Sequence, residues 1–125
     1  MQYFNTYIDQ LRFLEVSGKG DMATVKEYID KGGDPNACTS TGTIALINAT
    51  AHSQIEVVQY LLSIGADLTL KDQDGYNPIA MARKYKNKEV LEVFQTSPYV
   101  EETVREEIRR ARLFSIGIFN ERSLN

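Results

Sequence analysis

An internal repeat of 33 residues runs through this sequence and limits the folds open to it. A shift of 33 positions superposes matching turn residues and matching apolar residues: Gly32 on Gly65, Gly42 on Gly75, Asp34 on Asp67, Val25 on Val58 on Leu91, and Phe13 on Leu46 on Ile79. A period of this length is typical of stacked units, each too small to bury its apolar face alone. The sequence therefore predicts three stacked copies, over about residues 6–38, 39–71 and 72–96.

Apolar spacing within the second copy predicts a pair of helices. A short first helix is indicated by Ala45, Leu46 and Ala49, and a second helix by Ile55, Val58, Leu61 and Leu62. Gly65 can take the left-handed conformation that ends a helix. Pro78 suits the first turn of the corresponding helix in the third copy, where its missing N–H is not needed.

With this period and these turn residues, the chain resembles the ankyrin repeat family over about residues 6–96. The second copy, GTIALINATAHSQIEVVQYLLSIGADL, follows the family pattern in its back half, and the third, DQDGYNPIAMARKYKNKEVLEVF, keeps Asp72, Gly75, Pro78 and Ala82. The resemblance implies an all-α solenoid of helix-turn-helix units with short β-turn fingers, in which the first and last copies act as caps. We expect a repeat domain over residues 1–97, with a C-terminal helix and an apolar tail over residues 98–125.

The chain departs from the family pattern at two kinds of position. Ile44, Ala45 and Ile47 stand where the family usually has Thr, Pro and His, so apolar packing must replace a hydroxyl–imidazole brace, and Asn77 and Ala80 weaken that brace again in the third copy. Ser53 and Lys86 stand where glycine is usual between the two helices, so we expect irregular turns there. At the N-terminus, Tyr3, Phe4, Tyr7 and Ile8 are expected to lengthen the first helix and shield the stack.

The segment after Pro98 has its own helical pattern. Apolar or small residues recur every three or four positions, at Val100, Val104, Ile108, Ala111 and Ser115, which predicts an amphipathic helix ending near Gly117 and packing on Val90, Val93 and Phe94. Ion pairs one turn apart are expected between Glu101 and Arg105 and between Glu106 and Arg110. The apolar residues that follow, Leu113, Phe114, Ile116, Ile118 and Phe119, either fold back on the repeats, pair with a second chain or dock a partner.

Composition argues against several classes of function. A net charge of −3 and a pI near 5.2 give no broad positive field for nucleic acid. One cysteine and one histidine form neither a disulfide nor a zinc site. The sequence carries no basic leader and no run of about 18 apolar residues, so we expect a cytoplasmic protein that does not enter the membrane.

Candidate catalytic residues are scarce. His52 falls at a helix–helix linker and Cys38 at the start of a finger, and no residue pattern around them forms a triad. The GKGD stretch at 18–21 lacks the glycines and the hydroxyl of a phosphate loop, and the RRAR stretch at 109–112 is offset by preceding glutamates. We therefore expect neither an enzyme nor a bound cofactor or metal.

What remains is recognition of another protein. The family resemblance implies that the partner surface is concave and built from the finger tips and the exposed side of each first helix: Ser40, Thr41, Thr43, His52, Gln73, Asp74, Tyr76, Lys84 and Tyr85. Tyr76 and Tyr85 are the expected centre, because tyrosine is enriched among residues that dominate interfaces. The partner would be blocked or scaffolded.

Two other functions stay open. By analogy of fold and size, the chain could be a bacterial or phage immunity protein that occludes a toxin or an enzyme. It could instead be a structural protein that associates with itself through its apolar tail.

Overall fold

The structure is a computed structural model that describes residues 6–115, and side chains up to residue 110. Within this range the chain forms seven helices and no strand: α1 (Tyr7–Lys19), α2 (Met22–Asp30), α3 (Ala45–Ala51), α4 (Ile55–Ser63), α5 (Pro78–Lys84), α6 (Lys88–Thr96) and α7 (Glu102–Ser115). The prediction of an all-α repeat fold is confirmed.

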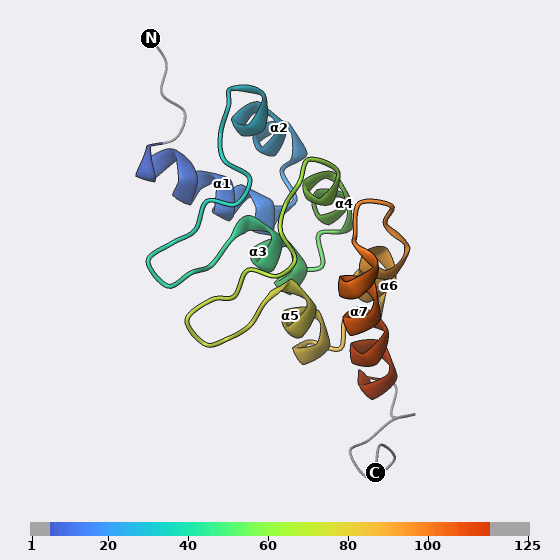
Figure 1. Ribbon diagram of the computed structural model, residues 1–125. Coiled ribbons are helices and arrows are strands. Elements are labelled where there is room, and N and C mark those ends of the chain that lie inside the picture. Colours follow the sequence, from blue (N-terminus) through green and yellow to red (C-terminus); the bar gives the residue numbers. More distant parts are fainter. Residues whose placement is uncertain (1–5, 116–125) are drawn as a thin grey trace.

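The first six helices form three pairs that stack in two rows. The first helices α1, α3 and α5 pack side by side, and the second helices α2, α4 and α6 form the neighbouring row (Figure 1). Two hairpin loops, the fingers, extend from the stack beside α3 and α5 (Figure 1). α7 packs on both α5 and α6 at the end of the array.

The repeat keeps its register in the structure. α2, α4 and α6 are each nine residues long and begin 33 positions apart, and α3 and α5 are each seven residues long. Gly32 and Gly65 follow α2 and α4 with φ angles of +90° and +95°. The two glycines therefore occupy the same helix-ending setting, as the repeat predicts.

The turns between paired helices are regular, so our expectation of irregularity at Ser53 and Lys86 is wrong. Gly20, Ser53 and Lys86 have φ angles of +78°, +57° and +54°. The next residue of each turn donates its backbone N–H to the carbonyl five residues back, at 3.0 Å for Asp21, 2.9 Å for Gln54 and 2.8 Å for Asn87. A left-handed conformation costs a non-glycine residue about 1–2 kcal/mol, which the packed pair of helices can sustain.

The starts of α3 and α5 are secured in different ways. Ile44, Ala45 and Ile47 are buried, so apolar packing does replace the polar brace in the second copy. In the third copy, Asn77 caps α5, because its side-chain oxygen accepts the N–H of Ala80 at 2.8 Å. Asn77 therefore restores part of the brace that we expected to be weakened. Pro78 lies in the first turn of α5, as predicted.

Side-chain amides tie each copy to the one before it. They donate from Asn48 to the Leu14 carbonyl at 2.7 Å, from Gln54 to the Gly18 carbonyl at 3.0 Å, and from Asn87 to the Ser53 hydroxyl at 2.6 Å. Between these bonds a single apolar core runs through the stack from Phe13 to Ile108. Neighbouring copies therefore share both their buried surface and their polar contacts.

The N-terminal end is less covered than expected. Tyr7 and Ile8 do lengthen α1, but they are 57% and 77% exposed, so they cover little of the stack. Tyr3 and Phe4 lie outside the described residues. The end of the core is instead formed by Phe13, whose ring stacks on that of Tyr28 with centroids 4.0 Å apart.

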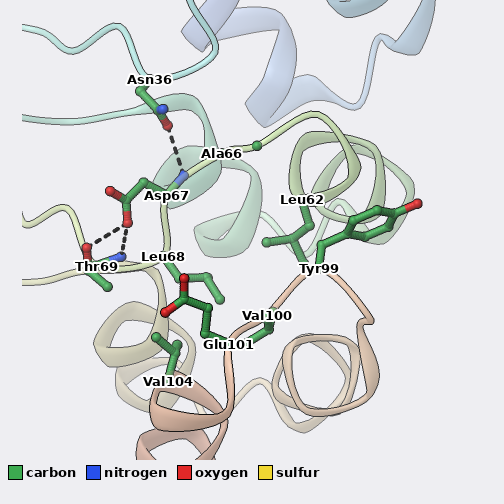
Figure 2. Close-up of a pocket in the computed structure, with 11 residues that line it drawn as sticks. Asn36, Leu62, Ala66, Asp67, Leu68, Thr69, Tyr99, Val100, Glu101 and Val104 are labelled. Atoms are coloured by element: carbon green, nitrogen blue, oxygen red, sulfur yellow. Dashed lines mark hydrogen bonds between the residues drawn. The ribbon is translucent and has the colours of Figure 1, made fainter.

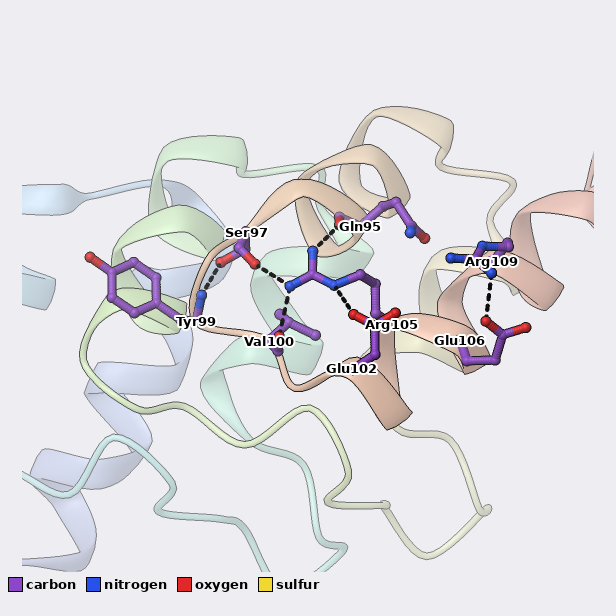
Figure 3. A network of polar contacts seen from close by, with 8 residues as sticks. All are labelled: Gln95, Ser97, Tyr99, Val100, Glu102, Arg105, Glu106 and Arg109. Carbon is purple, nitrogen blue, oxygen red and sulfur yellow. Dashed lines mark hydrogen bonds and ion pairs between the residues drawn. The ribbon is translucent and has the colours of Figure 1, made fainter.

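α7 caps the other end of the array, and Arg105 holds it there. α6 ends without the glycine turn of α2 and α4, so its last carbonyls need other partners. The guanidinium of Arg105 donates to the carbonyls of Gln95, Ser97 and Val100 (Figure 3). One side chain of α7 thus replaces a missing backbone turn.

The predicted packing of α7 is confirmed, and its predicted ion pairs are wrong. Val100 and Ile108 are buried in the same core as Val90 and Phe94. In the described part of α7 the ion pairs join residues three apart, Glu102 with Arg105 at 3.3 Å and Glu106 with Arg109 at 2.6 Å. The Arg105 guanidinium is engaged by the Glu102 carboxylate and by the carbonyls of Gln95, Ser97 and Val100.

The predicted helix end at Gly117 and the apolar tail at 116–119 lie outside the described residues, as do the side chains of Leu113 and Phe114. The division of the chain at residue 97 stays a prediction.

Candidate functional site

The two fingers are built on the same turn, 33 residues apart. In the first, the Thr39 N–H donates to the Thr43 carbonyl at 3.0 Å; in the second, the Asp72 N–H donates to the Tyr76 carbonyl at 2.9 Å. Gly42 and Gly75 occupy the left-handed position of each turn, with φ of +82° and +85°. The backbone therefore presents the two finger tips in the same way.

A side-chain oxygen stiffens each finger from inside. The Thr39 hydroxyl accepts the N–H groups of Thr41 and Thr43 at 3.3 and 3.2 Å. The Asp72 carboxylate accepts those of Asp74 and Tyr76, both at 2.9 Å. Because these oxygens hold the backbone before any partner arrives, less ordering would remain to be done on binding.

The fingers also hold each other. The Gln73 N–H donates to the Thr41 carbonyl at 2.8 Å, and a Cβ added to Gly42 would lie 3.0 Å from the Asp72 Cα. The two hairpins form one support for the predicted residues. We call this region the finger surface: the exposed side chains of residues 39–43 and 72–76 together with the C-terminal ends of α3 and α5.

The predicted partner-binding residues differ in exposure. Those exposed are Ser40, Thr41, His52, Gln73, Asp74, Lys84 and Tyr85, while Thr43 and Tyr76 are half-buried. The structure brings Thr41 to Gln73 and brings Lys84 to both tyrosines. His52 is the C-cap residue of α3, with Nδ1 2.9 Å from the Asn48 carbonyl oxygen of its own helix.

Lys84 joins the two tyrosines into one cluster. Its Nζ lies 4.7 Å from the ring centroid of Tyr76 and 5.7 Å from that of Tyr85. Tyr76 also packs against the core, whereas Tyr85 is 55% exposed. A cation over an aromatic face is worth about 0.5–1 kcal/mol at an exposed site, so this arrangement restricts the side chains that a partner would meet.

Sequence analysis missed the charge of this end of the molecule. Arg83, Lys84, Lys86 and Lys88 lie within six residues that contain no acidic residue, and all four are exposed. Only Lys84 was singled out, because family positions guided the choice of residues. A count of charge along the sequence would have found the run.

The structure also shows a hollow that sequence analysis did not predict. It has a volume of about 420 Å³ and lies between the loop at 65–69 and the segment at 99–104 (Figure 2). Its polar groups are largely engaged: the Asp67 N–H donates to Asn36 at 2.9 Å, and the Asp67 carboxylate accepts from the N–H and the hydroxyl of Thr69. Tyr99, 62% exposed, stands at its rim.

The described part of the chain holds neither a metal-binding cluster nor a membrane-spanning helix. Residues 6–110 contain no group of three or more His, Cys, Asp or Glu side chains placed to hold a metal ion. No helix among those described has the length and apolar character needed to cross a membrane. Cys38 is exposed and its backbone bridges to Ile44 at the base of the first finger.

Comparison with known proteins agrees with the repeat fold described above. A family model for ankyrin repeats, in three copies, matches residues 13–102. The chain is 34% identical to the potassium channel AKT1 of Arabidopsis thaliana over 77 residues. This match covers 62% of the present chain and 9% of the channel. It is 34% identical over 80 residues to a putative ankyrin repeat protein of Acanthamoeba polyphaga mimivirus, covering 64% of this chain and 11% of that protein.

A putative ankyrin repeat protein of Rickettsia bellii matches at 31% identity over 103 residues, covering 73% of this chain and 61% of that protein. The first two relatives are much longer, and this chain spans about a tenth of their length.

Proposed function

Since the chain belongs to the ankyrin repeat family, whose repeats serve generally as protein–protein interaction modules, we propose that it binds a partner protein through the finger surface. Tyr76 and Tyr85 form the centre of that contact, and Ser40, Thr41, Thr43, His52, Gln73, Asp74 and Lys84 surround them. The protein acts by occupying or positioning its partner rather than by chemistry of its own.

One observation carries this proposal: an exposed tyrosine stands on a rigid base. Tyr85 offers a large apolar ring with a polar tip to solvent, and Lys84 and Tyr76 restrict its surroundings. Aromatic groups of this kind contribute most of the binding free energy in many interfaces. The neighbouring fingers are held by their own hydrogen bonds, which lowers the entropic cost of docking.

We propose a cytoplasmic location. Cys38 is the chain's single cysteine and is exposed, and a lone surface thiol persists best in a reducing compartment.

The test begins with affinity capture from an extract of the source cells, followed by mass spectrometry to identify the partner. With the purified partner, Tyr85→Ala should raise Kd at least tenfold, about 1.4 kcal/mol. Tyr85→Ala is preferred to a Tyr76 variant because Tyr76 also packs on the core.

Tyr99→Ala is the matched control, since Tyr99 is exposed to a similar degree but lies at the hollow and not on the finger surface. Unchanged binding by Tyr85→Ala with weakened binding by Tyr99→Ala would move the contact to the hollow and refute the proposal.

A further inference from the structure

The turn between α5 and α6 carries an unusual concentration of positive charge. Arg83 and Lys84 end α5, Lys86 occupies the left-handed position, and Lys88 begins α6. Lys84, Lys86 and Lys88 form no ion pair with any residue that the structure describes. We call these four residues the basic edge.

Helix stability explains only half of the basic edge. Cations at a helix C-terminus interact favourably with the helix dipole, which accounts for Arg83 and Lys84. Lys88 lies in the first turn of α6, where the dipole disfavours a cation, and Lys86 occupies a backbone conformation that favours glycine. Two of the four charges are therefore placed against local preference.

The repeat architecture does not require these charges either. In the second copy the corresponding positions are Thr50, Ala51, Ser53 and Ile55, and in the first they are Ser17, Gly18, Gly20 and Met22. All eight are uncharged, and the turn has the same geometry in each copy. The positive charge is thus specific to the third copy, where Tyr76 and Tyr85 lie.

The basic edge is continuous with the centre of the finger surface. Lys84 belongs to both, because its ammonium lies over the rings of Tyr76 and Tyr85. A segment that covers Tyr85 therefore passes beside the cations of the turn. Because Lys84, Lys86 and Lys88 form no ion pair within the described residues, a partner bearing carboxylates would supply their counter-charge.

The charge of the rest of the molecule limits the kind of anion that fits. The whole chain has a net charge of −3 and residues 83–88 contribute +4, so the remainder has a net charge of −7. A long polyanion such as nucleic acid would be repelled beyond the edge, whereas a short acidic segment can lie along the edge and Tyr85 without extending over the acidic remainder.

We propose that the docking segment of the partner is a short acidic peptide that covers Tyr85 and pairs with the basic edge. This inference rests on the proposed function and names the class of partner that the finger surface accepts.

The experiment uses the full chain and a phage-displayed library of random 12-residue peptides as the probe. Peptides selected on the wild-type protein should be enriched in Asp and Glu relative to the library. A synthetic copy of the strongest binder should lose at least tenfold in affinity to Lys86→Glu/Lys88→Glu, and should bind more weakly as salt is raised.

Lys86→Glu/Lys88→Glu is expected to fold, since both side chains are exposed and a glutamate at Lys88 suits the start of α6. Lys26→Glu/Lys31→Glu is the control, because it makes the same change of charge at two exposed positions at the other end of the stack, one in α2 and one at its C-cap. The control should bind the acidic peptide as the wild type does.

The remaining outcomes separate this inference from the proposed function. Selection of neutral or basic peptides that still require Tyr85 would overturn the inference and leave the proposed function standing. Peptides that bind Tyr85→Ala and Lys86→Glu/Lys88→Glu as tightly as they bind the wild-type protein would overturn both. A single-stranded 12-mer of DNA that binds more tightly than the best peptide would replace the acidic peptide with nucleic acid.

Discussion

Tyr28 is a buried, hydrogen-bonded side chain of the first copy. Its ring stacks on Phe13, and its hydroxyl donates to the Asp34 carbonyl at 3.0 Å. A Cβ on Gly33 would lie 2.4 Å from the ring, so the adjacent backbone fits only a glycine. Burial, with a further contribution from the Asp34 carboxylate, raises the pKa of the Tyr28 phenol to about 12.

This pKa predicts how stability changes in alkaline solution. The folded pKa lies above the unfolded value of about 10, so the contribution of Tyr28 is complete below pH 10 and is lost as pH rises towards 12. Tyr28→Phe should lower the free energy of unfolding at pH 8 by about 1 kcal/mol, through the lost hydrogen bond, and should flatten its decline between pH 10 and 12. Urea titrations at pH 8, 10 and 11.5 measure both effects.

Tyr85→Phe is the control, because it removes a phenol hydroxyl from an exposed position outside the core. Parallel pH profiles for the wild type and Tyr28→Phe would show that the Tyr28 phenol is not the group responsible.

At the scale of elements, α6 and α7 depend on each other through Arg105. The guanidinium supplies donors for three carbonyls at the end of α6 and the segment after it, and its side chain is 23% exposed. Arg105→Ala should lower the free energy of unfolding by about 2 kcal/mol, because the carbonyls lose charged donors. Arg105→Lys should recover less than half of the loss, since one ammonium cannot reproduce the planar fork.

Arg109→Ala gives the comparison, because Arg109 pairs with Glu106 on the exposed face of α7. Its cost should stay within about 0.5 kcal/mol in the same denaturant titration. Equal losses for the two arginines would contradict the assigned role of Arg105.

The sequence predicts the helices well because apolar spacing and helix-ending glycines act locally. Gly32 and Gly65 mark the ends of α2 and α4, and Ile108 marks the buried side of α7. The role of Arg105 could not be predicted in this way, because spacing rules consider pairs within one helix and its partners lie at the end of another. The regular turn at Ser53 was missed because a residue preference was weighed without the hydrogen bonds that override it.

At the candidate site, too, the sequence predicts some features and not others. The repeat register places Tyr76, Lys84 and Tyr85 near one another, but the stacking of Lys84 over both rings depends on side-chain geometry that the register does not contain. Family positions do not include features peculiar to one copy, which is why the charges of Lys86 and Lys88 were not predicted to form a site.

At the scale of the whole molecule, the two fingers are in contact. A substitution in the first finger should disturb the second finger more than a substitution in the second disturbs the first. Gly42→Ala and Gly75→Ala should each cost about 1 kcal/mol through backbone strain. Only a Cβ at Gly42 meets the Asp72 backbone, whereas the space around Gly75 is open.

Gly42→Ala should therefore shift the amide NMR signals of residues 72–76, and Gly75→Ala should leave those of residues 39–41 close to their wild-type positions. Disturbance of both fingers by both variants, to the same extent, would mean that Gly42 holds no special place between them.

The position of α7 sets where the stack of repeats ends on that side. α7 covers the faces of α5 and α6 on which one more copy would stack, so the array cannot be lengthened there unless this helix is first displaced. Within residues 6–115, a partner therefore meets two fingers and one cluster of tyrosines, and no further repeat follows α6. Selectivity must then come from the side chains exposed on this surface. A change of partner would require substitutions there rather than additional repeats.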